Sequence, residues 1–293
     1  MIMNRNPIYG FEKLIKEYAR FPKFIPLPAH FEHGWTTLED PLPGDLKTNM
    51  PLMLVFSNRR KSAWEKHSSI PVEIIGSPMV FYRKKNKIKR SSSASGTIVF
   101  PSHSTKDIDV KYDIDDFCNR LLNLPLEFHP FTICLHWEDI KRNVDKLYKN
   151  KGFEVVTAGD MYSDQFPRNF YNILKNYKYS ASNEVGTYTF YSIEMGIPFF
   201  LIGEPAVRIN NGNDINIDKK IYNINEFKYG EIAKNLFSQV QTYISPEQLE
   251  FVNKELGINE LVDRHKLHFL LWKSLFKIIF SYRLKLVLKK LFN

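Results

Sequence analysis

The most constraining feature of the sequence is a regular alternation of short apolar runs and helical patterns between Gly96 and Pro205. The apolar runs predict five strands, and segments with helical periodicity predict the four helices between them. Strands connected by such crossover helices pair in parallel, so this region is predicted to form a Rossmann-like α/β lobe. The predicted strands are 96–102, 131–137, 152–159, 178–183 and 197–203, and the predicted helices are 113–124, 138–150, 164–177 and 185–196.

A similar but weaker pattern precedes this region and predicts a second, shorter α/β lobe within residues 1–90. Its strands are expected within 23–35, 51–58 and 70–78, with a helix at 59–68. The basic and Ser-rich stretch 83–96 is interpreted as a linker to a larger lobe of residues 96–262. In that lobe, 210–216 reads as a turn-rich loop and 226–256 as helical, with Ser245 as N-cap and Pro246 at the first helical position.

The C-terminal segment 264–293 is predicted to be a basic amphipathic helix. It carries Lys or Arg at 273, 277, 283, 285, 289 and 290, and has no acidic residue from His268 onward. Its apolar runs are too short to span a bilayer, so we expect it to lie on an anionic membrane surface. The alternative is a terminal helix docked on the protein itself or on a partner. No nucleic-acid-binding motif accompanies the charge, and no nucleic acid partner is predicted.

The cysteine content and the N-terminus favour the cytoplasm, with the protein peripheral on the inner face of the membrane. Cys118 and Cys134 both lie within apolar patterns, as buried reduced thiols do. The N-terminal residues lack the continuous apolar core of a signal peptide.

Ligands of parallel α/β sheets bind at the carboxyl ends of the strands, where this sequence places small, polar and ionisable residues. Gly186 and Thr187, with the preceding Ser182 and Asn183, begin a helix whose N–H groups can bind phosphate; the alternative is an ordinary N-cap. Ser102, His103, Ser104 and Thr105 follow the first strand of the lobe and offer hydroxyls to phosphate oxygens, or form a polar turn. His136 follows the second strand, close to Glu138 and Asp139, and this group could act in acid–base chemistry. The alternative is that the two acids only favour the start of a helix.

In the first lobe, candidates for a general base follow an apolar run: His33, Glu32 and Asp40, in that order. A metal site at His30 and His33 is not predicted, because residues three apart on an extended segment point to opposite faces. No cofactor is predicted.

The arrangement resembles the GT-B glycosyltransferases of bacterial surface-polysaccharide pathways over residues 25–205. Residues 33–35 (HGW), 74–78 (IIGSP) and 182–200 carry the resemblance. It implies two Rossmann-like lobes with a nucleotide sugar bound to the second and Glu194 contacting the ribose. If the reaction retains the anomeric configuration, we expect a carboxylate such as Asp160 to take part. Many retaining members have a Glu five residues before the Gly of the last motif, where this chain has Tyr191.

These features predict a metal-independent glycosyltransferase that transfers a sugar, of hexosyl, sialyl or Kdo type, from a nucleotide-sugar donor to a glycan or lipid-linked acceptor. The alternative is a non-catalytic assembly protein that binds glycan or membrane on a Rossmann scaffold. The first lobe is short for the GT-B fold, which leaves open whether a partner completes it.

Overall fold

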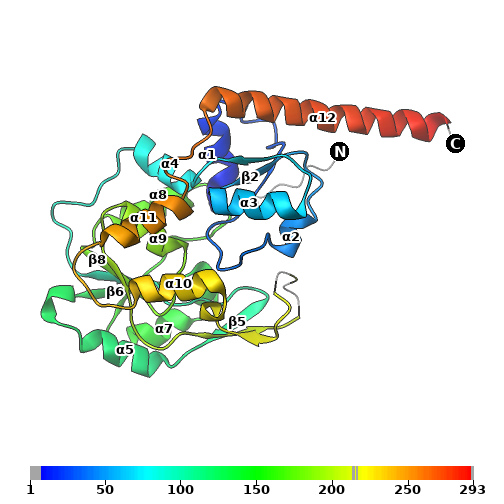
Figure 1. Cartoon of the computed structure of the whole chain (residues 1–293). Helices are drawn as coiled ribbons and strands as arrows, with labels where there is room; N and C mark the ends of the chain where they lie inside the picture. The colour runs from blue at the N-terminus through cyan, green and yellow to red at the C-terminus, as the bar shows by residue number, and fades with distance from the viewer. Residues whose placement is uncertain (1–7, 213–214, 216, 292–293) are drawn as a thin grey trace.

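The computed structural model describes residues 8–212, 215 and 217–291, with side chains up to residue 281. The chain forms two α/β lobes, the first of which is short (Figure 1). This first lobe has a parallel three-stranded sheet in the order β1-β2-β3. Its elements are α1 (Phe11–Tyr18), β1 (His30–Phe31), α2 (Pro43–Leu46), β2 (Met53–Val55), α3 (Asn58–His67), β3 (Val72–Ile74) and α4 (Pro78–Lys85).

The second lobe contains a parallel five-stranded sheet in the order β7-β6-β4-β8-β9. Each predicted strand of this region is present, and so is each predicted helix, except that residues 138–150 form two helices divided at Arg142 and Asn143. The strands are β4 (Thr97–Val99), β6 (Phe131–Cys134), β7 (Glu154–Val156), β8 (Tyr179–Ser182) and β9 (Phe199–Leu201). The helices between them are α5 (Ile114–Leu122), α6 (Trp137–Lys141), α7 (Val144–Lys149), α8 (Phe166–Leu174) and α9 (Thr187–Glu194).

The order of these strands determines where a ligand can bind. Chain order begins in the middle of the sheet at β4, proceeds outward through β6 and β7, and then returns to the other side of β4 as β8 and β9. This is the Rossmann order, and it creates a crevice at the carboxyl ends of β4 and β8, where the direction of progression reverses.

A third sheet, absent from the sequence-based prediction, is antiparallel and has the order β11-β10-β5. It joins β5 (Ile108–Lys111) to β10 (Val207–Asn210) and β11 (Ile221–Tyr222), with Val207 opposite Lys111 and Asn210 opposite Ile108. The predicted turn-rich segment 210–216 therefore begins in the last residue of β10 and leads toward β11.

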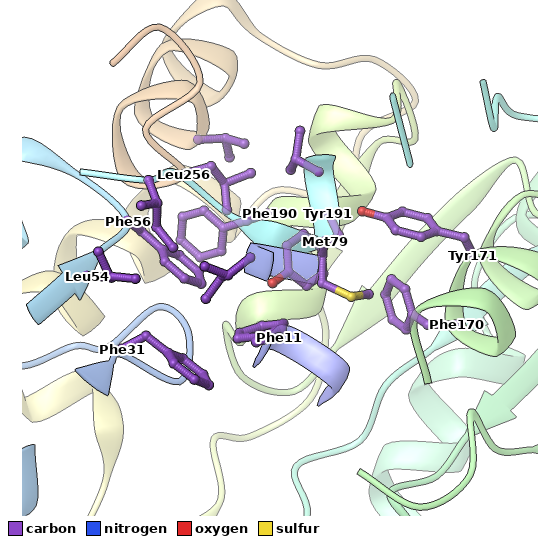
Figure 2. Packing of buried hydrophobic residues seen from close by; sticks show 14 of the residues in the cluster. Phe11, Phe31, Leu54, Phe56, Met79, Phe170, Tyr171, Phe190, Tyr191 and Leu256 are labelled. Atoms are coloured by element: carbon purple, nitrogen blue, oxygen red, sulfur yellow. The ribbon is translucent and has the colours of Figure 1, made fainter. Parts of the chain in front are cut away.

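One hydrophobic cluster crosses between the lobes. Phe31, Leu54 and Phe56 enter it from the first lobe, and Phe170 and Phe190 from the second (Figure 2). Each of these side chains is at most 6% exposed. The two lobes therefore share a core.

The stretch predicted as a linker is partly helical. Residues 83–85 end α4, and Arg83 donates to both carboxylate oxygens of Glu194 at 2.6 and 2.5 Å. The prediction was wrong for these residues, because the guanidinium is held by an acid more than a hundred residues away in sequence.

Three helices complete the chain: α10 (Lys228–Phe237), α11 (Pro246–Glu255) and α12 (Arg264–Leu291). Ser245 caps α11 as predicted, its Oγ accepting from the Gln248 N–H at 3.2 Å. The first half of α12 packs on the first lobe through buried Leu267, Leu271 and Leu275, and the remainder extends beyond the body of the molecule (Figure 1). No helix among the described residues is long and apolar enough to cross a membrane.

Candidate functional site

A cavity of about 360 Å³ lies between the two lobes at the crevice of the five-stranded sheet. Its volume is within the range of small-molecule sites. The second lobe lines it with residues that follow four strands, namely β4, β6, β7 and β8, and the antiparallel sheet adds Arg208 and Tyr222. The first lobe closes it with Tyr9, Phe11, Met79 and the segment 33–37, apart from Gly34.

Two stacked imidazoles form one wall. His103 follows β4 and His136 follows β6, and because these strands are neighbours the rings lie with their centroids 4.2 Å apart. Burial lowers the pKa of His136 to about 4, and burial together with the nearby His136 and Arg208 lowers the pKa of His103 well below its usual value. Both rings are therefore neutral at neutral pH.

A guanidinium from the antiparallel sheet faces the same region. Arg208 on β10 has a side chain 15% exposed, and its Nη2 donates to Oε2 of Glu184 at 2.6 Å. Glu184, 1% exposed, also accepts from the Ser102 hydroxyl at 2.7 Å. This pair connects the antiparallel sheet to the carboxyl ends of β4 and β8.

The N-terminus of α9 forms another wall. Gly186 and Thr187 begin the helix, and their position favours negative charge in the cavity. A side chain at Gly186 would overlap the ring of Tyr188, which stacks on Phe100 at 4.9 Å. Gly34 of the first lobe lies so close that an added Cβ would be 2.9 Å from the Thr187 hydroxyl.

His33 is the candidate base that lines the cavity. Burial lowers its pKa, opposed by Asp45 and reinforced by His30, so it too is neutral at neutral pH. The adjoining Trp35 is fixed by a hydrogen bond from its Nε1 to Glu255 at 2.8 Å.

The structure thus brings five of the predicted residues together in the cavity: His33, His103, His136, Gly186 and Thr187. Their common origin is the carboxyl end of a strand, the position from which they were predicted.

The predicted hydroxyl and amide groups instead support the backbone around the cavity. Ser182 donates to the Phe100 carbonyl at 2.6 Å, and the Asn183 carbonyl oxygen accepts from both the N–H and hydroxyl of Ser102. Ser104 accepts from the Val110 N–H, and Thr105 from the N–H groups of Asp107 and Ile108. Direct contact of Ser102, Ser104, Thr105, Ser182 and Asn183 with a ligand in the cavity is therefore not supported.

Three of the predicted acids are held away from the cavity by other groups. Glu32 is 3% exposed, accepts from Arg60 Nε at 3.0 Å and also accepts the Phe56 N–H. Asp40 has a side chain 71% exposed, 3.5 Å from His67. Glu194 is paired with Arg83, which removes the basis for a ribose contact. These placements do not support a role for Glu32 or Asp40 as base.

Asp160 lies just beyond the cavity. It is exposed, and its Oδ1 accepts the Tyr162 N–H at 2.8 Å. Its charge opposes the lowering of the His136 pKa. This position does not supply the carboxylate that a retaining reaction needs inside the cavity.

Several lining residues were not predicted: Arg208, Tyr188, Trp35, Thr36 and Thr37. Trp35 lies two residues after the predicted His33, and Tyr188 one residue after Thr187, so extending each motif by one or two residues would have found these two. Arg208 lies on an unpredicted strand. Within the described part of the chain, no group of three or more His, Cys, Asp or Glu side chains could hold a metal ion.

Comparisons with known proteins give only distant structural similarity. No protein-family model matches the sequence, and no curated protein matches it. Among solved structures, UDP-GlcNAc 2-epimerase from Neisseria meningitidis bound to UDP-GlcNAc has a TM-score of 0.43 and 12% identity, covering 94% of this chain and 84% of its own. The wall teichoic acid polymerase TagF has a TM-score of 0.35 and 11% identity over 76% of this chain, which spans about half of TagF. Both scores are below 0.5, so neither similarity identifies a function.

Proposed function

We propose that the cavity between the lobes binds a nucleotide-sugar donor and that the protein transfers the sugar to a glycan or lipid-linked acceptor in surface polysaccharide synthesis. The observation that carries the proposal is the convergence of His33 from one lobe with His103, His136, Arg208 and the α9 N-terminus from the other. A donor bound at the switch point would place its phosphates against positive groups and its sugar toward the first lobe.

In this proposal His33 acts as the general base of an inverting transfer. A neutral imidazole can accept the proton of the acceptor hydroxyl while the oxygen attacks the anomeric carbon. The bond from that carbon to the phosphate oxygen breaks, and its electron pair leaves with the nucleotide. Of the four predicted catalytic residues, His33 alone lines the cavity, which favours inversion over retention.

Stabilisation of the leaving phosphate is assigned to protein groups instead of a metal ion. Arg208 carries a positive charge in a region shielded from water, where its interaction with developing negative charge is strong. The α9 N-terminus adds a partial positive charge.

A panel of nucleotides and nucleotide sugars, assayed by thermal unfolding, tests the donor site, because a ligand that binds only the folded state raises the melting temperature. One selective nucleotide class should do so. His33→Asn should retain this shift and lose transfer by at least about a hundredfold, the contribution of a general base. His67→Asn, an imidazole change outside the cavity, should retain both. If no nucleotide or nucleotide sugar raises the melting temperature, the alternative is favoured, a non-catalytic scaffold that binds glycan or membrane.

We further propose that α12 holds the protein on an anionic membrane surface, at the cytoplasmic face. Phe269, Phe276 and Phe280 are 64, 64 and 71% exposed and lie at spacings of seven and four residues, with Lys273 and Lys277 exposed beside them. This stripe faces away from Leu271 and Leu275, which pack on the first lobe. Cys118 and Cys134 are free thiols, which supports a reducing compartment.

Vesicle sedimentation tests this assignment. Each phenylalanine contributes about 1.5–3 kcal/mol if fully buried, so Phe269→Ser, Phe276→Ser and Phe280→Ser together should weaken binding to phosphatidylserine vesicles at least tenfold. The matched control is Phe24→Ser, 86% exposed but outside α12. Equal binding of the triple variant and the control would contradict the proposal.

A further inference from the structure

Unpartnered polar atoms concentrate beside the cavity. Of the eight buried side-chain nitrogen and oxygen atoms without a hydrogen-bond partner among the described residues, four belong to this region: His136 Nε2, Arg208 Nε, Asn183 Nδ2 and Glu184 Oε1. They belong to one connected group: Glu184 binds both Arg208 and Ser102, Asn183 binds Ser102, and His103 next in sequence stacks on His136. Leaving a buried donor unpaired costs about 1–3 kcal/mol, so the two donors on cavity-lining residues, His136 Nε2 and Arg208 Nε, indicate a place where a ligand supplies acceptors.

Two of these atoms are donors on residues that line the cavity. His136 Nδ1 accepts from the Glu138 N–H at 3.4 Å, which places the proton of the neutral ring on Nε2. Arg208 Nε carries a hydrogen at all accessible pH values. Both side chains line the cavity. His136 and Arg208 also each lower the pKa of His103 through electrostatic interaction, so the three side chains act on one another.

Glu184 fixes the direction of the guanidinium. Its Oε2 accepts hydrogen bonds from Nη2 of Arg208 and from the Ser102 hydroxyl, and Nε of Arg208 stays unpaired. It also balances the charge of Arg208 when the cavity holds no ligand, a balance that reduces the cost of burying the guanidinium. Glu184 is therefore a positioning residue, not a ligand contact.

We propose that Arg208, His103 and His136 form a phosphate subsite that holds the phosphate groups of the donor. Phosphate oxygens are acceptors only, which matches the donors of His136 and Arg208, and a forked guanidinium is suited to them. The assignment rests on the proposed function for the identity of the donor, but the anion site can be tested without it. Phosphate recognition is thereby assigned to Arg208 of the antiparallel sheet and the two histidines, and not to the hydroxyls of residues 102–105 that were predicted from the sequence.

Calorimetric titration of the full chain with inorganic pyrophosphate tests the subsite. Removing Arg208 alone would leave Glu184 as an unpaired buried charge, so the informative comparison is Glu184→Gln against the double variant Glu184→Gln with Arg208→Gln. The double variant should bind pyrophosphate about ten- to a hundredfold more weakly, the contribution of a hydrogen bond to a charged group. His136→Phe, which keeps a flat ring and removes the donor, should weaken binding about five- to tenfold.

Arg120→Gln is the matched control, since Arg120 lies in the same lobe and pairs with Asp116 and Glu204 at the surface. Its pyrophosphate affinity should equal that of the wild type. The proposal is overturned if pyrophosphate does not bind the wild type at millimolar concentration, or binds every variant alike. Nucleotide-sugar binding by the same proteins tests the proposed function separately. Binding of pyrophosphate without binding of any nucleotide sugar would contradict the proposed function. Binding of a nucleotide sugar without binding of pyrophosphate would contradict the subsite.

Discussion

Glu255→Gln is expected to destabilise the protein through the junction between its lobes. Glu255 on α11 is 6% exposed and accepts from Arg59 Nε at 2.9 Å and Nη2 at 2.5 Å, and from Trp35 Nε1 at 2.8 Å. The carboxylate therefore joins α11 to α3 and to the segment that closes the cavity. Glutamine retains an acceptor for Trp35 but no charge for the buried guanidinium.

The expected loss of unfolding free energy is about 3 kcal/mol. Removing one partner of a buried ion pair costs about 3–5 kcal/mol, because the other charge stays buried. The lower end applies here, since Arg59 keeps hydrogen bonds to the carbonyls of Leu38 and Thr36 and contacts the Tyr229 ring at 4.0 Å. At about 2 °C per kcal/mol for a chain of this size, the melting temperature should fall by about 6 °C.

Equilibrium urea unfolding, followed by tryptophan fluorescence, measures the change. Glu250→Gln is the matched control: it removes the same charge from the same helix, from an ion pair with Lys254 in which both side chains are at least 70% exposed. Such pairs contribute less than about 1 kcal/mol. If the two variants were destabilised equally, the carboxylate of Glu255 would not hold the lobes together and the reasoning would be refuted.

Two further predictions follow from backbone strain and from burial of an imidazole. Gly257→Ala should lower the unfolding free energy by more than about 2 kcal/mol, because φ is +60° and the new Cβ would overlap the Phe56 carbonyl oxygen; Gly152→Ala, with φ of +85° and open space, should cost about 1 kcal/mol in urea unfolding. Below pH 6.5 the unfolded state protonates His136 first, since its folded pKa is about 4, so wild-type stability falls from pH 6.5 to 4. His136→Gln should show a smaller fall between pH 7 and 5, and an equal fall would contradict the burial assigned to this ring.

The five-stranded sheet could be predicted from sequence, whereas the antiparallel sheet could not. Its strands alternate apolar and polar residues, as in IDVK and VRIN, but over only four residues each, too short a stretch to separate a strand from a polar loop. Residues 108–111 pair with 207–210 across about a hundred residues, and no local turn signals this pairing. The pairing of these strands therefore depends on contacts between distant segments and could not be predicted from the local sequence.

The candidate site, like the fold, contains residues that could be predicted from sequence and residues that could not. His33, His103, His136, Gly186 and Thr187 follow predicted strands, and the rule that ligands bind at carboxyl ends was sufficient to select them. The same rule also selected Ser102 and Ser182, because it gives a residue's position and not the direction of its side chain. Both hydroxyls point instead to protein acceptors, Ser102 to Glu184 and Ser182 to the Phe100 carbonyl.

The short first lobe still completes the cavity, which bears on whether a partner must supply the missing strands. Its contribution comes from three places: the segment after β1, with His33 and Trp35, the start of α1, with Phe11, and the start of α4, with Met79. Glu255 fixes the first through Trp35, and the shared hydrophobic cluster holds Phe11 and Met79. Because none of these contacts involves a strand beyond β1, β2 and β3, the three-stranded lobe by itself holds His33 against the second lobe.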